Sequence, residues 1–170
     1  MDRKLTKNRQ QELVEVLPNI RRFAMSLAGS LADADDLLQS TVERLLTRGI
    51  PDDAAVLPWS LRVCKNLWID ELRSQKVRRD ATTEPAVIGE QVEDGERKLH
   101  GEMTLQEVQD VLQSMSDEHR MVLELVAVEG FSYKEAAAAL EIPVGTVMSR
   151  LARARTALLE RSGFEPGPAY

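Results

Sequence analysis

The chain has 170 residues, of which 43% are hydrophobic, and a formal net charge of −6, which argues against non-specific binding to nucleic acid. It contains no apolar run near the roughly 18 residues of a membrane span, and MDRKLTKNRQQ lacks the apolar core of a signal peptide. One cysteine and two scattered histidines exclude an internal disulfide and give no zinc pattern. We therefore expect a soluble, cytoplasmic protein with no membrane insertion, metal or cofactor.

The total charge hides a segregation of charged residues along the chain. Residues 58–80 carry six Lys or Arg against three acidic residues, and residues 144–162 carry four against one. Residues 81–118 carry ten acidic residues against two basic ones, a local balance of −8. Two basic segments are therefore separated by an acidic one, and the total charge is a poor guide to the partners.

Apolar residues recur at helical spacing through the first fifty positions. They predict one helix over 8–28, in which Pro18 causes a kink or a restart and Gly29 ends the helix. A second helix follows, with Asp33 as its cap and two aspartates in its first turn, where the helix dipole favours negative charge. Its predicted buried face consists of Leu37, Leu38, Thr41, Leu45 and Leu46.

A third long helix is predicted from Pro58 to about Arg79, after a loop at 49–53. Its polar face consists of Arg62, Lys65, Asn66, Asp70 and Arg73, and its end is a basic run. Basic residues at the end of a helix often do no more than complement the helix dipole. This run alone therefore does not establish a nucleic-acid site.

Residues 81–101 show no sustained periodicity and contain many acidic residues, so we predict a flexible acidic linker. Helical spacing resumes from Glu102, and Ser116 is the predicted cap of the next helix. No strand pattern appears anywhere. The predicted fold is all-α, with two small helical domains, 8–80 and 102–162, joined by the linker.

The second, four-helix domain ends in two helices joined by a short turn, a helix-turn-helix. Ser132 and Glu135 form the S-x-x-E capping box that opens the first of these helices. Its predicted buried residues are Tyr133, Ala136, Ala137 and Leu140. Pro143 cannot continue that helix but can start the next. The buried stripe of the last helix is Val147, Leu151, Ala154 and Leu158.

The outer face of this last helix carries hydroxyl groups and arginines. It presents Thr146, Ser149, Ala152, Arg153 and Thr156, with Met148 and Arg150 at its flanks. Such a face is typical of the recognition helix of a DNA-binding helix-turn-helix. A solvated helix hairpin in a bundle is the alternative. The arginines at 150, 153 and 155, opposed only by Glu160, favour DNA.

Three stretches resemble, in the same order, motifs of the extracytoplasmic-function (ECF) family of bacterial RNA polymerase sigma factors. The family's D-D-L-x-Q stretch for binding core polymerase is similar to ADDLLQ at 34–39. Its W-L-x-R-I-x-x-N stretch for promoter melting resembles PWSLRVCKN at 58–66, continued by IDELR at 69–73. Its promoter-reading helix resembles IPVGTV at 142–147 followed by SRLARAR at 149–155. The resemblance covers nearly the whole chain.

The resemblance implies that domain 8–80 holds the minus-ten promoter element and domain 102–162 the minus-thirty-five element. It implies a pocket for unstacked bases formed by loop 49–57 together with Asn66. The implied minus-ten and melting residues are Trp59, Arg62, Lys65, Asn66 and Arg73. The implied minus-thirty-five residues are Thr146, Met148, Ser149, Arg150, Ala152, Arg153 and Arg155. The implied polymerase-binding residues are Asp35, Asp36, Gln39 and Arg44.

The resemblance also implies the partners: core RNA polymerase, promoter DNA and an anti-sigma protein, with a chain that is monomeric when free. In the free chain, the linker would let the two domains pack together or be clamped by the anti-sigma protein. No enzymatic activity is implied, and Cys64, His100 and His119 are interpreted as structural residues.

Two alternatives stay open. A sigma-like mimic could keep this fold to sequester an anti-sigma protein, although the arginines of 150–155 count against that interpretation. An ordinary helix-turn-helix regulator would usually dimerise, and the sequence shows no spare dimerisation helix.

Four positions depart from the family pattern. Met148 and Ala152 stand where the reading helix commonly has larger or polar residues, so base contacts there would be mainly apolar, for instance to thymine methyl groups. Leu61 stands where the family often has an aromatic residue, so base stacking would depend on Trp59 or Trp68. Glu141 stands where glycine frequently ends a helix in a left-handed turn, and a non-glycine residue there costs ~1 kcal/mol.

Overall fold

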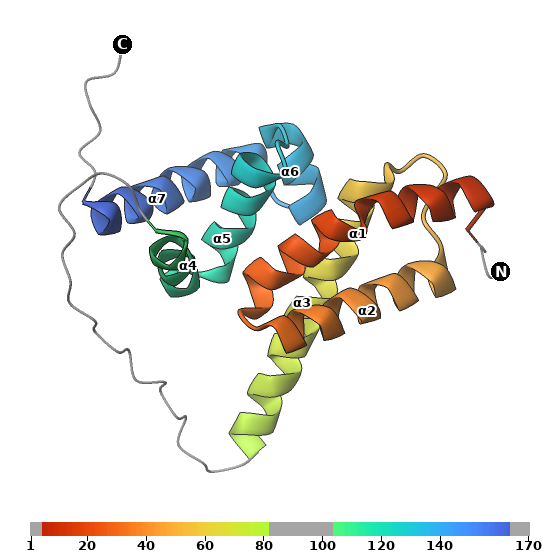
Figure 1. Cartoon of the computed structure of the whole chain (residues 1–170), viewed down its shortest axis with the longest axis horizontal. Helices are drawn as coiled ribbons and strands as arrows, with labels where there is room; N and C mark the ends of the chain where they lie inside the picture. The colour runs from red at the N-terminus through yellow and green to blue at the C-terminus, as the bar shows by residue number, and fades with distance from the viewer. Residues whose placement is uncertain (1–4, 82–103, 164–170) are drawn as a thin grey trace.

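The computed structural model describes residues 5–81 and 104–163, and every regular element within them is a helix, which confirms the all-α fold (Figure 1). The elements are α1 (Lys7–Ala28), α2 (Leu31–Arg48), α3 (Val56–Ala81), α4 (Leu105–Ser114), α5 (Asp117–Leu123), η1 (Glu124–Val128), α6 (Tyr133–Leu140) and α7 (Val144–Ser162). The π-helical turn η1 directly continues α5. Except for Ala81, the predicted linker 81–101 lies outside the described residues, as do 102–103 and the C-terminal tail.

Helices α1, α2 and α3 pack on one another as a first group. Helix α1 runs through Pro18 without a restart, and Gly29, at φ 76°, ends it as predicted. The predicted cap of α2 is wrong: Ser30 is the cap, and its hydroxyl accepts a hydrogen bond from the Asp33 backbone N–H at 3.2 Å. Asp33 instead lies in the first turn, where its charge suits the helix dipole.

Helix α3 begins at Val56, two residues before the predicted start, and ends at Ala81. Pro58 is tolerated because the first turn of a helix has no internal partner for its N–H groups. The core of this first group is built from fully buried side chains: Ile20, Phe23, Leu45, Leu61 and Cys64. Leu46 was wrongly predicted to be buried and is 48% exposed, because it lies about 100° round the helix from Leu45.

Helices α4, α5, α6 and α7 form a second group. The predicted caps are confirmed: Ser116 caps α5, and Ser132 with Glu135 forms the capping box of α6. Within α7, Val147, Leu151 and Ala154 are buried as predicted. The prediction for Tyr133 is wrong. At the first position of α6 its ring is 37% exposed, and Ala139 is buried in that helix instead.

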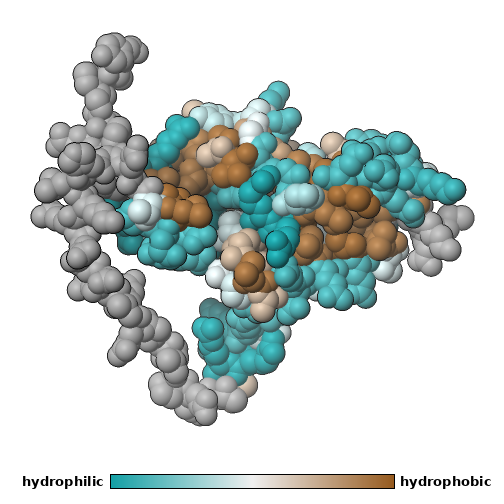
Figure 2. All heavy atoms as spheres, viewed as in Figure 1, coloured by the Kyte–Doolittle hydropathy of each residue, from teal (hydrophilic) through white to brown (hydrophobic). Residues whose placement is uncertain are grey.

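The two groups touch along two lines, α3 against α6 and α1 against α5. The groups also approach closely where Gly29, at the end of α1, meets α4, because a Cβ atom on Gly29 would lie 2.7 Å from the Gln113 side chain. Apolar side chains also reach the surface over both groups, with hydrophilic side chains between them (Figure 2). The helix groups are therefore assembled against each other in the described chain.

Candidate nucleic-acid and polymerase interfaces

The first half of α3 carries the predicted minus-ten side chains. The guanidinium carbon of Arg62 lies 5.3 Å from the centroid of the Trp59 ring, within cation–π range. Lys65 is buried, with 6% of its surface exposed, whereas Asn66 and Arg73 are exposed. The helix thus brings these residues onto one element, but it hides one of the two central cations.

The C-terminal end of α6 lies against both cations, and it buries Lys65 but leaves Arg62 half-buried. Arg62 Nη2 donates to the Ala138 carbonyl at 2.5 Å, and Lys65 Nζ donates to the Leu140 carbonyl at 3.0 Å. The Glu141 carboxylate oxygen Oε1 lies 3.5 Å from Arg62 Nε and 3.8 Å from Lys65 Nζ. Burial lowers the pKa of Lys65, and the nearby Glu141 charge opposes that shift.

A pocket of about 270 Å³ lies where α2 ends and α3 packs beside it. Its lining is Arg44, Leu45, Arg48, Gly49, Ile50, Pro51, Trp59, Val63, Asn66, Leu67 and Asp70. The pocket therefore lies where the family resemblance places one, beside loop 49–57 and Asn66. Arg9 of α1 holds this loop in place, because its guanidinium donates to the carbonyls of Pro51, Asp52 and Ala54 at 2.7–3.1 Å.

The outer face of α7 is open. Ser149, Ala152 and Arg153 are exposed, and Met148 is 53% exposed. Thr146 is half-buried, and its carbonyl accepts a hydrogen bond from the Ser149 hydroxyl at 3.1 Å.

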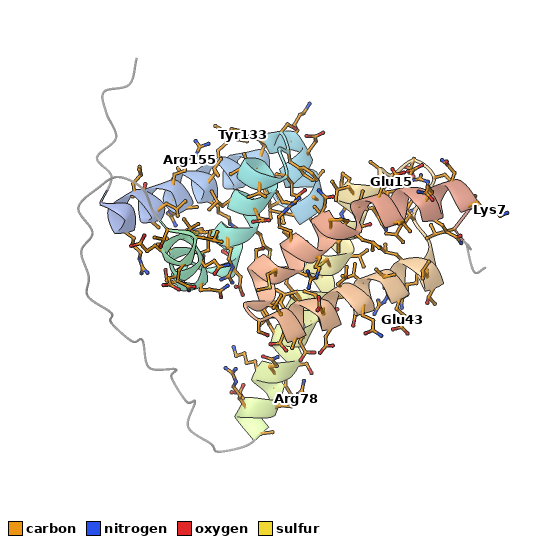
Figure 3. All side chains as sticks on the ribbon, viewed as in Figure 1. Lys7, Glu15, Glu43, Arg78, Tyr133 and Arg155 are labelled. Carbon is orange, nitrogen blue, oxygen red and sulfur yellow. The ribbon has the colours of Figure 1, made fainter. Side chains whose placement is uncertain are left out.

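The arginines of α7 differ in their surroundings. Arg150 pairs with Glu118 of α5 at 3.3 Å, which ties it to the flank of the helix. Arg155 is exposed and points outward from α7 (Figure 3). Arg153 is exposed beside Ala152 on the outer face. The predicted minus-thirty-five residues thus lie along one helix, with Arg150 already partnered.

The predicted polymerase-binding residues lie on α2. Asp36, Gln39 and Arg44 are exposed. Asp35 is engaged within the first helix group, because Arg21 Nε donates to its carboxylate at 2.9 Å, and this bond lowers the pKa of Asp35. Arg44 also lines the small pocket beside α3, so it stands between the two predicted surfaces.

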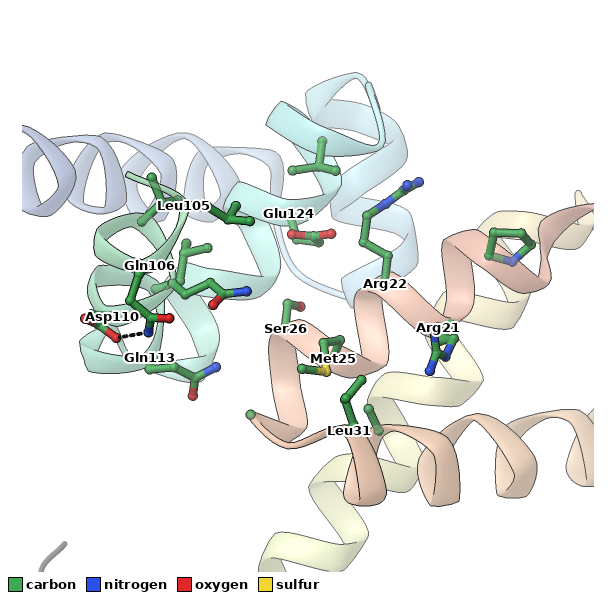
Figure 4. A pocket seen from close by; sticks show the side chains of 17 residues that line it. Arg21, Arg22, Met25, Ser26, Leu31, Leu105, Gln106, Asp110, Gln113 and Glu124 are labelled. Carbon is green, nitrogen blue, oxygen red and sulfur yellow. Dashed lines mark hydrogen bonds between the residues drawn. The ribbon is translucent and has the colours of Figure 1, made fainter. Parts of the chain in front are cut away.

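A larger cavity, of about 760 Å³, lies between the two helix groups and is lined by α1, the start of α2, α4 and η1 (Figure 4). Exposed aliphatic side chains border it: Leu31 is 61% exposed, Leu105 77% and Val128 51%. Glu124 also lines the cavity, with 6% of its surface exposed, and its Oε1 has no hydrogen-bond partner in the described structure.

Glu124 differs from its neighbour Glu129. Both oxygens of Glu129 accept hydrogen bonds from α1, from Asn19 at 2.6 Å and from Arg22 at 2.9 Å. Burial raises the pKa of Glu124 to about 7, with a further rise from Glu129 and an opposing effect of Arg22. The sequence analysis missed Glu124. The sequence does contain a signal for it, since Glu124 is an acidic residue within the apolar run that includes Val122 and Leu125. Both of these neighbours are fully buried in the structure.

The cysteine and the histidines were interpreted from the sequence as structural residues. Cys64 is fully buried, and burial raises the pKa of its thiol to about 12, which makes it a poor nucleophile. His119 lies in the first turn of α5, and His100 lies outside the described residues. Among the described residues there is no cluster of potential metal ligands. Within 5–81 and 104–163, no helix has the length and apolar character needed to cross a membrane.

The two helix groups match two parts of one protein family. Residues 13–78 match Sigma-70 region 2, and residues 105–158 match Sigma-70, region 4. The first match contains α2 and most of α3, and the second runs from α4 nearly to the end of α7.

Relatives align over most of the chain. It is 30% identical over 156 residues to the ECF RNA polymerase sigma factor EcfG of Rhodopseudomonas palustris, covering 91% of this chain and 84% of that protein. It is 35% identical over 144 residues to the ECF RNA polymerase sigma factor SigC of Mycobacterium tuberculosis, covering 83% of this chain and 76% of that protein.

Solved structures show the same fold. The sigma factor RpoE of Bartonella quintana, in complex with the anti-sigma factor NepR, has a TM-score of 0.76 and 27% identity, covering 95% of this chain and 100% of that one. The anti-anti-sigma factor PhyR of the same organism shares the fold at a TM-score of 0.60 and 18% identity, covering 89% of this chain but 49% of that one. Relatives of 30% identity or more that align over most of their length settle the family. The chain belongs to the ECF family of RNA polymerase sigma factors, the alternative sigma subunits that direct promoter-specific transcription initiation.

Proposed function

We propose that the chain binds core RNA polymerase through the outer face of α2 and contacts promoter DNA through two separate surfaces. Helix α3, with the pocket at its start, would hold the single-stranded minus-ten element, and α7 would read the duplex minus-thirty-five element. The observation that carries this assignment is the pocket beside Asn66, on the same helix as Trp59, Arg62 and Lys65.

The chemistry of promoter opening supports the role of α3. A base that leaves the stack needs a pocket, and the strand that carries it needs cations along its backbone. The pocket of about 270 Å³ offers an aromatic ring, Trp59, and an exposed amide, Asn66, to a base. Arg62, Lys65 and Arg73 would then contact the phosphates of the same strand.

The role of α2 follows from its charge. Asp36 and Gln39 are exposed on a helix whose acidic residues cannot attract phosphate, so this surface suits a protein partner. Arg21 already neutralises Asp35, which leaves Asp36 as the carboxylate we assign to the polymerase contact.

Transcription with purified core polymerase tests the proposal. Run-off reactions on a genomic promoter library should give discrete transcripts only when the chain is added, and gel filtration should show a complex with core polymerase. A chain that forms no complex with core polymerase, in the absence of any anti-sigma protein, would refute the proposal. We further propose that the chain acts in the cytoplasm, where polymerase works, and has no enzymatic activity of its own.

We also propose that an anti-sigma protein binds in the 760 Å³ cavity between the helix groups, as an amphipathic helix carrying one Lys or Arg. Apolar side chains at its rim, such as Leu105, suit the apolar face of a helix laid in a groove. The unpartnered Glu124 oxygen at its wall suits a cationic side chain, because a buried carboxylate is costly unless it is paired.

The partner's cation would favour the charged form of Glu124, so binding should strengthen as the pH rises from 6 to 8. Arg22 and Glu129 are the charged groups that act on Glu124, while Arg21 and Asp110 line the same cavity. Isothermal titration with the inhibitor that co-purifies from the host checks this dependence. Glu124→Gln should abolish it, and Leu105→Ser should weaken binding while Val14→Ser, an exposed apolar residue outside the cavity, should not.

The two remaining alternatives have weaker support. A sigma mimic needs no DNA surface, yet the exposed hydroxyl and arginine face of α7 is intact. The protein of 18% identity shares the fold alone, whereas the relatives of 30–35% identity are sigma factors. An ordinary helix-turn-helix regulator would not need the pocket between α2 and α3.

A further inference from the structure

The C-terminal end of α6 presents negative charge to the cations of α3. Ala138 and Leu140 belong to the last turn of α6, where the helix cannot pair all of its own carbonyls, although the Glu141 backbone N–H donates to the Ala138 carbonyl at 3.4 Å. These carbonyls carry the partial negative charge of a helix C-terminus, and the Glu141 carboxylate adds a full charge beside them. Carbonyl and carboxylate oxygens therefore meet Arg62 and Lys65 where phosphate oxygens of a DNA strand would otherwise bind.

Glu141 holds a backbone conformation that its residue type disfavours. It has φ 57° and ψ 44°, and it is the one non-glycine residue with positive φ among the described residues. Glycine would end α6 in the same conformation without a steric penalty on Cβ. Disfavoured conformations persist at positions that the surrounding structure uses. What surrounds this carboxylate is Arg62 and Lys65.

We propose that Ala138, Leu140 and Glu141 form an intramolecular latch, which occupies Arg62 and Lys65 in place of DNA phosphate. While the latch is closed, the free chain cannot hold the minus-ten strand with these two cations. Binding of core polymerase, or of the strand itself, must open it. This inference rests on the proposed role of Arg62 and Lys65 in holding that strand.

The contacts of Glu141 in the latch are weak enough to be broken. The Glu141 side chain is 51% exposed, and its distances of 3.5 and 3.8 Å to the two cations exceed those of good charge-assisted hydrogen bonds. Arg62 Nε is buried without a hydrogen-bond partner. Because the Glu141 carboxylate is open to solvent, its attraction to the two cations is weakened by water and screened by salt. The second contact between the groups, from Asn19 and Arg22 to Glu129, does not involve these cations and can persist.

Two measurements on the full chain test the latch. Fluorophores on cysteines introduced at Ser40 of α2 and Lys134 of α6, both exposed, report the separation of the helix groups. Native Cys64 is fully buried and should remain unlabelled. The affinity for a random-sequence single-stranded DNA 12-mer reports whether the cations are available, since phosphates are common to all sequences.

Glu141→Gly and Glu141→Gln should both lengthen the mean label separation and tighten 12-mer binding by roughly two- to tenfold, the range expected for the loss of two ion pairs that share one exposed carboxylate. Raising the salt concentration should lengthen the separation in the wild-type chain and have less effect in these variants. Glu160→Gln is the matched control, because it removes an exposed charge from α7 without touching α3, and it should change neither reading.

Each outcome has one meaning. If Glu141→Gly leaves both the separation and the 12-mer affinity at wild-type values, the latch does not exist. If it lengthens the separation, but adding Arg62→Ala and Lys65→Ala leaves DNA affinity unchanged, the latch stands and the proposed role of those cations in DNA binding fails.

Discussion

Helices α3 and α7 are both amphipathic and both carry cations on the polar face, yet they differ in what lies against that face. On α3, Lys65 is 6% exposed and donates to a carbonyl of α6. On α7, Arg153 and Arg155 are exposed, and no hydrogen bond or ion pair of their side chains is found among the described residues. One surface is covered by the chain itself, and the other is open to solvent.

The difference comes from the neighbours, since the charges of the two helices are alike. The negative end of α6 points at α3, whereas no element of the described ranges 5–81 and 104–163 covers the outer face of α7 in the same way. The assembled chain therefore leaves the surface proposed for duplex DNA open and covers two cations of the surface proposed for single-stranded DNA. A sigma factor arranged in this way would open DNA only after polymerase has rearranged its helix groups.

The largest effect should come from the covered surface. Changing Arg62 and Lys65 together to alanine removes two charged hydrogen-bond donors, each contributing about 1.5–3 kcal/mol, so open-complex formation should fall by roughly two to four orders of magnitude. Permanganate footprinting of holoenzyme on a consensus promoter measures this loss.

Lys76→Ala is the control, because it removes an exposed cation of α3 outside the predicted set. A double variant that opens promoters normally would mean that the covered face of α3 has no part in melting.

A smaller effect is expected on the open surface. Arg153→Ala should cost about 1–3 kcal/mol and relax the preference at one base pair of the minus-thirty-five element, because Arg153 lies on the exposed face of α7 beside Ser149 and Ala152. Transcription from a panel of single-base promoter variants checks this. Equal weakening of every promoter would instead show that Met148 and Arg150 form the reading edge.

Several features of the fold were predictable from the sequence because their causes are local. Capping residues such as Ser116 and Ser132 act within one turn, so their effect can be seen in four consecutive residues. The same holds for Gly29, whose positive φ ends α1, whereas the left-handed conformation of Glu141 was expected only from the resemblance to the family. Local chemistry thus defined most helix ends, with the cap of α2 as an exception.

The candidate site was predictable only in part. The end of α6 covers the cations of α3 through contacts between residues that are far apart in the sequence. Arg62 was expected on a polar face, and it is on one, but its partner Ala138 lies 76 residues away. The unpartnered Glu124 likewise reflects the packing of α1 and α4 around η1. Periodicity assigns a residue to a face, and tertiary packing decides what lies against that face.

The third effect concerns the first half of α2, which lies outside both proposed DNA surfaces, although the end of the helix lines the pocket beside α3. Asp36→Arg should raise the dissociation constant for core polymerase about tenfold, or about 1.4 kcal/mol, because it reverses an exposed charge at the edge of the proposed interface. Surface plasmon resonance with immobilised core polymerase measures the change. The control is binding of the variant to duplex minus-thirty-five DNA, which should be unaffected, and a parallel loss there would indicate misfolding.

The smallest effect should come from Arg155, which points outward at the flank of the open surface (Figure 3). A flanking arginine of this kind contacts phosphate, and phosphates carry no sequence information. Arg155→Ala should therefore weaken binding to all promoter variants alike and reduce the slope of log affinity against log salt concentration by about one. Measurements at two salt concentrations separate this variant from Arg153→Ala, whose slope should stay close to that of the wild-type chain. If Arg155→Ala changed base preference while Arg153→Ala changed the salt slope, α7 would sit in the groove rotated from the orientation proposed here. The flank of α7 that carries Arg155 would then be the surface that reads the bases, and Arg153 would contact phosphate.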